Sequence, residues 1–341
     1  RHTRYISVTG VQTCALPICF PLDRGSFGNA VLDLQRRLHA SEEFGDLTFT
    51  EGKYCGNTAL AIERFQLLRG LPATGICDHV TWSALVESSW ILGSRLLYLT
   101  SPHMRGDDVR LMQTVLAKLG FDCGRADGIF GPNTLRALTE FQQNYGITAD
   151  GICGVNTIRA LERTSSQSGD GPGIVTVREY ENLLSSTESS GSQRIVVRYF
   201  GTRTQLTRML VRELRAHNAD VMTVENADPH THARTAHSFE AHVYLGVAST
   251  PELGVQLAYY QTNSFTSAGG KLAAEMCEGV VRQSCDLSSL QIQGMQLPVL
   301  RETRMPAVLC AIGPDIDHVA EVGLSTPLST AIIQWCTRPI R

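Results

Sequence analysis

The sequence lacks several features that would assign it to a functional class at once. Its 30 basic and 33 acidic residues give a net charge of -3 over 341 residues, which excludes a whole-chain basic footprint for nucleic acid or an anionic membrane. No apolar run approaches the length needed to span a bilayer. GxSxG, P-loop and GxGxxG motifs are also absent. We therefore expect no nucleic-acid partner and no transmembrane segment.

Cysteine is present but thinly spread, and no two of the ten cysteines form a CxxC pair. Their density is low for a disulfide scaffold, and Cys310 lies inside an apolar, strand-like run. We interpret them as buried free thiols in a reducing compartment, although their even number leaves disulfides open. The 43% hydrophobic and 18% charged residues are typical of a soluble globular chain, and the length indicates two or three domains.

The first residues do not read as part of a domain. The opening stretch, RHTRYISVTGVQTCALPIC, has no continuous apolar core and is a poor signal peptide. The run 8–18, VTGVQTCALPI, resembles the in-frame translation of a sequencing-library adapter. We interpret residues 1–19 as adapter-derived sequence and leave them out of the fold prediction.

An internal repeat organises the first half of the chain. Segments 27–88 and 105–164 match at an offset of 76 residues, and their front portions match at an offset of 78. The shared positions include Asn57/Asn133, Thr58/Thr134, Phe65/Phe141, Gln66/Gln142, Gly75/Gly151, Cys77/Cys153, Gly28/Gly106 and Gln35/Gln113. These identities indicate a duplicated unit of small-domain size.

The second copy shows most clearly which residues should form, begin and end the helices of this unit. Apolar residues recur at helical spacing from Val109 to Leu119, and Gly120 ends that helix. Gly131 and Pro132 open a second helix, because proline is tolerated at the first helical position. Gly146 closes it, and a third helix begins at 155. Each copy is thus predicted to be a three-helix unit with glycine-containing turns.

These turns resemble the type-1 peptidoglycan-binding module of bacteria, a three-helix domain. The second copy carries the motif DGIFGPNT…FQ…G…DGICG whole. The resemblance implies binding of peptidoglycan or its precursors by Asp127, Gly128, Phe130, Gly131, Thr134, Phe141, Gln142, Asp150 and Gly151. In the first copy Glu51–Gly52 and Tyr54–Cys55–Gly56 replace the DGxFG turn, and we place Ala73 at the position of Asp150. If either copy binds a ligand, we expect it to be the second.

We divide the chain into modules at 20–90 and 103–164, a polar linker at 165–193 and a C-terminal domain at 194–341. Strand-like runs at 195–199, 221–224, 243–247 and 307–312 alternate with helical runs at 205–217, 271–282 and 327–335. This alternation predicts an α/β domain with a mostly parallel sheet. The predicted fold class is therefore multidomain α+β, with two three-helix modules followed by an α/β domain.

The C-terminal domain resembles the zinc-dependent N-acetylmuramoyl-L-alanine amidases. LRETRMPAVLCAIG at 300–313 carries the likeness best, supported by ARTAHSFEAHVYLGVAS at 233–249. The order of two modules and an amidase-like domain is most similar to the CwlM-type amidase homologues of actinobacteria. The resemblance places Ala248 at a zinc-ligand histidine and Ala311 at the catalytic glutamate. Arg198 stands at an aspartate position, and the glycine-rich loop that should follow is deleted together with its histidine and the next glutamate ligand.

Hydrolysis of an amide by zinc requires neutral histidine or carboxylate ligands and a nearby carboxylate base. Alanine supplies neither function, so we expect no catalytic residue and no metal ligand. A cluster at 228–242, which includes His230, His232, His237 and His242, offers an alternative zinc site. We interpret these histidines instead as solvated or loop residues.

Two hypotheses follow. The first is a non-catalytic, amidase-like protein that regulates peptidoglycan synthesis by binding cell-wall fragments or proteins of that synthesis, in the cytoplasm or peripherally at the inner membrane. The alternative is a divergent zinc amidase that is secreted to the cell wall and cleaves the glycan–peptide bond. Only the alternative needs a cofactor, which is zinc.

Overall fold

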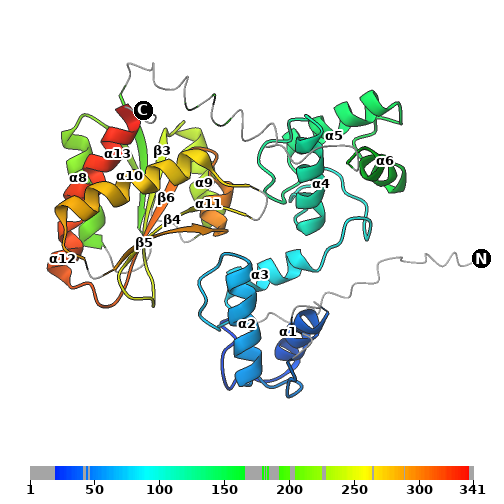
Figure 1. Ribbon diagram of the computed structural model, residues 1–341, viewed down its shortest axis with the longest axis horizontal. Coiled ribbons are helices and arrows are strands. Elements are labelled where there is room, and N and C mark those ends of the chain that lie inside the picture. Colours follow the sequence, from blue (N-terminus) through cyan, green and yellow to red (C-terminus); the bar gives the residue numbers. More distant parts are fainter. Residues whose placement is uncertain are drawn as a thin grey trace, which may run out of the picture.

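The computed structural model describes residues 20–40, 44, 47–165, 179, 181, 183, 192–199, 204–224, 228–262, 265–287 and 289–337. Figure 1 shows an α/β domain beside two small helical units. The predicted fold class is confirmed. The stretch interpreted as adapter-derived lies outside the described residues, as does most of the predicted linker.

Each repeat folds into three helices. The first repeat contains α1 (Asn29–His39), α2 (Gly56–Leu68) and α3 (His79–Ser88), and the second contains α4 (Asp107–Lys118), α5 (Pro132–Tyr145) and α6 (Val155–Ser165). Helix α5 begins after Gly131, with Pro132 in its first turn. It ends at Gly146, whose φ of 76° is the left-handed conformation that glycine adopts without steric cost. The local signals in the sequence therefore set these helix ends correctly.

The C-terminal domain is built on a six-stranded sheet in the order β2-β1-β3-β6-β4-β5. Its strands are β1 (Arg194–Tyr199), β2 (Asp220–Val224), β3 (Val243–Ser249), β4 (Val255–Tyr260), β5 (Leu290–Met295) and β6 (Ala307–Ile312). Neighbouring strands are parallel except for β4 and β6. The predicted sheet is confirmed as mostly parallel.

Helices cover both faces of this sheet. On one face α8 (Thr204–Ala216), α10 (Ala268–Ser284) and α13 (Ser325–Thr337) pack together, and Figure 1 shows α10 and α13 crossing it. On the other face lie α9 (Pro229–Ser238) and α11 (Pro298–Glu302). A further helix, α12 (His318–Gly323), contacts α8 and α13. Side chains alternate along the strands, so the sheet contributes to a separate apolar core on each face.

The sequence prediction missed β4, β5, α9, α11 and α12. The eight cysteines among the described residues form no disulfide; five of them are buried as predicted, whereas Cys55, Cys285 and Cys336 are half-buried. None of the described helices is long and apolar enough to cross a membrane.

Candidate functional site

One buried glutamine amide holds each turn that carries the repeat motif. In the second repeat, Gln142 Nε2 donates to Asp150 Oδ1 (3.0 Å), the Ile152 carbonyl (3.0 Å) and Thr157 Oγ1 (3.1 Å). Its Oε1 accepts the backbone N–H of Gly151 (2.9 Å). The amide thus satisfies polar groups that would otherwise be left unpaired as the turn folds against α5.

The same arrangement occurs four times, twice in each repeat. The glutamine, the glycine whose N–H it accepts and the threonine hydroxyl to which it donates are Gln35/Gly52/Thr58, Gln66/Gly75/Thr81, Gln113/Gly128/Thr134 and Gln142/Gly151/Thr157. In every case the glycine has a positive φ. The motif residues that identified the repeat therefore stabilise the turns of its fold.

Most of the predicted ligand-binding residues of the second repeat are core residues. Those buried are Gly128, Phe130, Thr134, Phe141, Gln142 and Gly151, whereas Asp127 and Gly131 are half-buried and Asp150 is exposed. The structure brings Asp127, Gly128 and Thr134 together around Gln113, and it brings Asp150 and Gly151 together around Gln142. Contact of these residues with a ligand stays a prediction.

The placement of Ala73 opposite Asp150 was wrong. Thr74 is the counterpart, because its Oγ1 accepts from Gln66 Nε2 (3.2 Å) and from the backbone N–H of Ile76 (3.2 Å). Asp150 Oδ1 makes the equivalent two bonds in the second repeat. A hydroxyl oxygen in the first repeat thus replaces a carboxylate oxygen in the second.

In the C-terminal domain, the two alanines at the expected catalytic positions are neighbours. Ala248 on β3 is the register partner of Ala311 on β6. Both lie near the carboxyl ends of parallel strands, where α/β proteins commonly place their ligands. Neither methyl group can bind a metal ion or transfer a proton, so this pair does not provide the zinc ligand and base that the resemblance implies.

A buried arginine lies on the same sheet face. Arg198 on β1 is paired in register with Gly246 on β3, two residues before Ala248. It is fully buried, and burial lowers the pKa of its guanidinium to about 10 although nearby Tyr244 and Asp228 oppose this. A cationic side chain here repels a divalent cation, so the residues present do not fit zinc.

The histidines at 228–242 are not a solvated loop, and this correction follows from α9. His232 on that helix is fully buried, and its Nδ1 lies 3.2 Å from the Tyr244 hydroxyl. His237 Nε2 accepts the backbone N–H of Arg304 (3.1 Å), and His242 Nδ1 accepts that of Arg194 (3.2 Å).

These three histidines therefore point to three different partners. The side chain of His230 lies outside the described residues. In the part of the chain that the structure describes, no three His, Cys, Asp or Glu side chains are grouped to hold a metal ion.

Comparison with known proteins agrees with the repeat. Residues 27–85 and 105–161 match the family described as "Putative peptidoglycan binding domain". The two repeats are modules of this family. The first module below is the repeat that contains α1 to α3, and the second module is the repeat that contains α4 to α6.

Among curated proteins, the chain is 43% identical over 140 residues to N-acetylmuramoyl-L-alanine amidase CwlM of Mycobacterium tuberculosis, covering 40% of this chain and 34% of that protein. It is 33% identical over 148 residues to the amidase CwlL of Bacillus licheniformis, covering 38% of this chain and 41% of that protein. These matches span less than half the length of either relative.

Solved structures show weaker likeness. The amidase AmiC2 of Nostoc punctiforme aligns with a TM-score of 0.37 at 14% identity, covering 44% of this chain and 100% of that chain. An amidase from Clostridium difficile 630 gives the same TM-score and identity, with coverage of 43% and 97%.

Sequence reasoning missed a junction where both modules meet the α/β domain. Arg301 on α11 donates to both carboxylate oxygens of Glu87 on α3 of the first module, at 2.7 and 3.3 Å. The backbone N–H of Gln296 donates to the carbonyl of Gly70 in the same module. Burial opposes the charge on Arg301, but Glu87 outweighs burial and raises the pKa of the guanidinium.

The second module contacts α11 and the residues on either side of it, within 296–304, through three arginines. Arg105 donates to Glu302 (2.8 Å), and Arg110 donates to the Gln296 side chain (3.1 Å). Arg125, in the turn before Asp127, donates to the backbone carbonyls of residues 303 and 304. No local sequence pattern predicts these contacts, because each joins residues that are more than 170 positions apart in the sequence.

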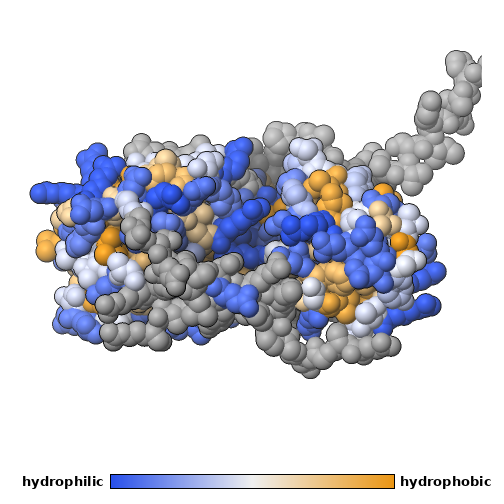
Figure 2. Space-filling model, turned by 90° about the horizontal axis from the view of Figure 1, so that it is seen from above, coloured by the Kyte–Doolittle hydropathy of each residue, from blue (hydrophilic) through white to orange (hydrophobic). Residues whose placement is uncertain are grey.

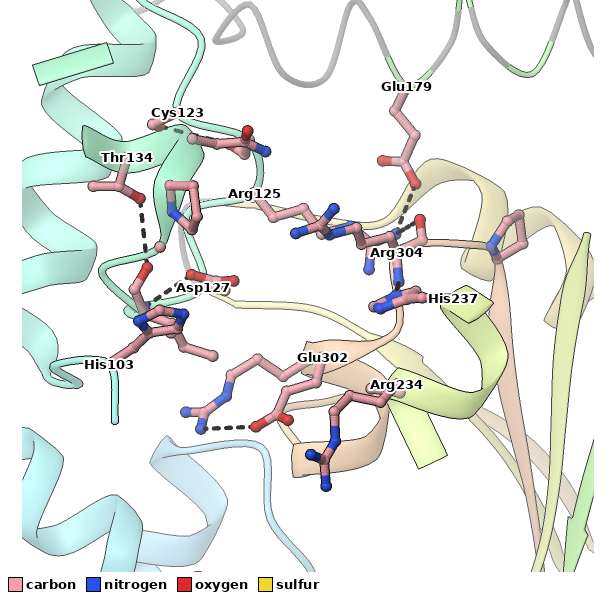
Figure 3. Close-up of a pocket in the computed structure, with 18 of the residues that line it drawn as sticks. His103, Cys123, Arg125, Asp127, Thr134, Glu179, Arg234, His237, Glu302 and Arg304 are labelled. Carbon is pink, nitrogen blue, oxygen red and sulfur yellow. Dashed lines mark hydrogen bonds and ion pairs between the residues drawn. The ribbon is translucent and has the colours of Figure 1, made fainter. Parts of the chain in front are cut away.

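Between the second module and the α/β domain lies a cavity of about 1100 Å³. Figure 2 shows hydrophilic residues gathered in the hollow between the two lobes of the molecule. Figure 3 shows Arg125 and Asp127 reaching it from the module, with Arg234, His237 and Arg304 on the opposite side. The turn that carries the module's motif therefore faces the α/β domain across this cavity.

Proposed function

We propose that this chain is a non-catalytic, amidase-like protein that regulates peptidoglycan synthesis. Its modules bind peptidoglycan or its precursors, and the assembly acts through bound cell-wall fragments or through proteins of that synthesis. The observation that carries the proposal is the register pair Ala248 and Ala311, which stands where the amidase resemblance requires a metal ligand and a proton-transfer group. Arg198 supports it, because a buried cation on that face opposes a metal ion.

The comparisons support the cell-wall part of this proposal. Both modules match a family named for peptidoglycan binding, and the curated relatives are named N-acetylmuramoyl-L-alanine amidases. The proposal locates the protein in the cytoplasm or peripherally at the inner membrane, where precursors are made. Secretion to the cell wall belongs to the amidase alternative.

The amidase alternative requires a zinc site built from residues other than the usual ones. Within the described residues, the histidines near α9 are the strongest candidates, but His232, His237 and His242 each contact a different group. Nothing in their geometry favours this second function over the first.

The test combines metal analysis with two assays on isolated sacculi. We expect the purified full chain to contain no stoichiometric zinc and to release no muropeptides, yet to sediment with sacculi. Because the modules are intact, binding controls for a folded protein in the cleavage assay. Stoichiometric zinc together with chelator-sensitive muropeptide release would overturn the proposal.

A matched variant makes the same test sharper. A248H/A311E restores the two side chains that the amidase resemblance requires, but it leaves Arg198 in place. We expect this variant still to bind no zinc, because one histidine beside a buried guanidinium is a poor site. Zinc binding and cleavage by A248H/A311E alone would show that the two alanines are what prevents catalysis.

A further inference from the structure

The cavity between the second module and the α/β domain is large enough for a ligand. Its volume of about 1100 Å³ exceeds what a single inorganic ion needs and is of the order of small-molecule sites. Figure 3 shows that both walls are polar, with Arg125 on the module side and Arg304 on the α/β side. The chemistry of a ligand therefore depends on which of these charges are already neutralised.

The acidic side chains that line the cavity are engaged within the protein. Glu302 accepts from Arg105 at 2.8 Å. Glu179 accepts from the Ser267 hydroxyl at 2.8 Å, and it pairs with Arg125 at 3.4 Å. These carboxylates hold the domains together and leave little negative charge to attract a cationic ligand.

The three lining aspartates are engaged in their own turns. Asp127 accepts the backbone N–H of Ile129 at 2.9 Å, and Asp122 accepts the N–H two residues further on at 3.1 Å. Asp228 accepts both the backbone N–H and the hydroxyl of Thr231, at 3.0 and 2.7 Å. Each carboxylate thus stabilises a local backbone conformation.

Two arginines on the α/β wall are different. Arg234 on α9 and Arg304 ahead of β6 are exposed and form no ion pair with any described residue. Arg234 donates only a 3.3 Å bond to the Thr231 hydroxyl. The backbone of Arg304 is held by its N–H···Nε2 bond to His237, which fixes where its side chain begins. These two guanidinium groups therefore carry positive charge that no ion pair among the described residues neutralises, and they line a concave site.

The geometry points to an anion-binding site in this cavity, in which Arg234 and Arg304 bind a ligand that carries carboxylate or phosphate groups. Arginine suits both anions because its planar fork donates two parallel hydrogen bonds. The site belongs to the α/β domain and does not depend on whether the modules bind peptidoglycan. Within the proposed function, an anionic cell-wall fragment or precursor would occupy it.

Calorimetric titration of the full chain tests the site with three defined probes. These are a muramyl peptide with free carboxylates, the same peptide with its carboxylates amidated, and inorganic pyrophosphate. We expect the free muramyl peptide or pyrophosphate to bind, and the amidated peptide to bind at least tenfold more weakly. Binding of only one anion identifies whether carboxylate or phosphate is the recognised group. Failure of both anions to bind would overturn the inference.

Substitutions of the two arginines test whether the anionic probe binds in this cavity rather than elsewhere on the protein. R234A/R304A should weaken binding of the anionic probe at least tenfold, and R234K/R304K should fall between that variant and the wild type. R208A/R212A is the matched control, because both arginines are exposed on α8 and lie outside the cavity. Equal binding by R234A/R304A and R208A/R212A would overturn the inference. Cleavage of sacculi would instead bear on the proposed function alone.

Discussion

The two modules share one fold but build its turns from different atoms. In the first turn of the second module, Gln113 donates to the Asp127 carboxylate (3.1 Å). In the first module, Gln35 donates instead to the backbone carbonyl of Thr50 (3.0 Å). Both modules have the glutamine, whereas the Asp127 side chain is an addition in the second module, and burial raises the pKa of its carboxyl group. That addition lies beside the cavity, so the second module is the better candidate for ligand binding.

The modules also differ in how they dock. Among the described residues, the first module has one ion pair with the α/β domain, Arg301–Glu87, both of whose side chains are at least four-fifths buried, beside the backbone hydrogen bond between Gln296 and Gly70. The second module contacts the α/β domain through three separate arginines, Arg105, Arg110 and Arg125. The first module should therefore depend on a single contact more than the second does.

The largest expected effect comes from removing that contact. E87A removes the carboxylate to which Arg301 donates and leaves Glu302, at 3.9 Å, as its remaining ion pair among the described residues, and the loss of a buried partner costs about 3 kcal/mol. Hydrogen exchange should rise in α3 and around Gly70 but not in α5. E63A is the control, because Glu63 is exposed on α2. Equal protection in E87A and E63A would contradict this dependence.

A second comparison concerns the buried amides. Q35L should lower the free energy of opening of its module by about 2 kcal/mol, because carbonyl and hydroxyl groups lose their donor. Q113L should cost about 3 kcal/mol, since one of the hydrogen bonds it removes goes to the Asp127 side chain, where Gln35 donates to a backbone carbonyl. Native-state hydrogen exchange in α2 and α5 measures both values. Equal losses would show that Asp127 adds nothing to the stability of the second module.

The smallest expected effect concerns the reactivity of a cysteine thiol in the first module. Cys55 precedes α2 where the second module has Gly131. Burial raises the pKa of the Cys55 thiol, but hydrogen bonds with the backbone at Thr50 and with Thr58 outweigh burial and lower the pKa to about 7. Burial raises the pKa of Cys77 to about 12.

Because the thiolate is the reactive form, alkylation of Cys55 should rise with pH about a midpoint near 7. Cys77 should stay unlabelled up to pH 9. Mass spectrometry of iodoacetamide-treated protein measures both rates, with C55S as the control. A midpoint near 9 for Cys55 would show that these hydrogen bonds do not act on the thiol.

The accuracy of prediction followed how local each signal was. Helix α5 was bounded correctly because Pro132 and Gly146 act within their own turn. Helix α9 was not predicted and its histidines were interpreted as solvated or loop residues, although Asp228 followed by Pro229 is a helix-start signal. Strands β4 and β5 were missed because the alternation prediction assigned no strand to 255–260 or 290–295.

Some residues of the candidate site could likewise be predicted from local signals and others could not. Asp127 and its neighbours were found from the repeat, since the motif specifies the turn that contains them. Arg234 and Arg304 were not singled out, because an arginine without a partner looks like any other surface arginine in a sequence. Their meaning depends on which carboxylates across the cavity are already engaged.

The sequence by itself determined the duplicated helical modules, the parallel α/β domain and the alanines at positions 248 and 311, because spacing, caps and residue identity are properties of short segments. Only the tertiary structure decided that the two alanines are neighbours, that Arg198 is buried on their face, and that the second module's motif turn faces a basic wall. Those relations depend on which distant segments pack together, and the free energy of that packing is spread over contacts that no single stretch of sequence contains.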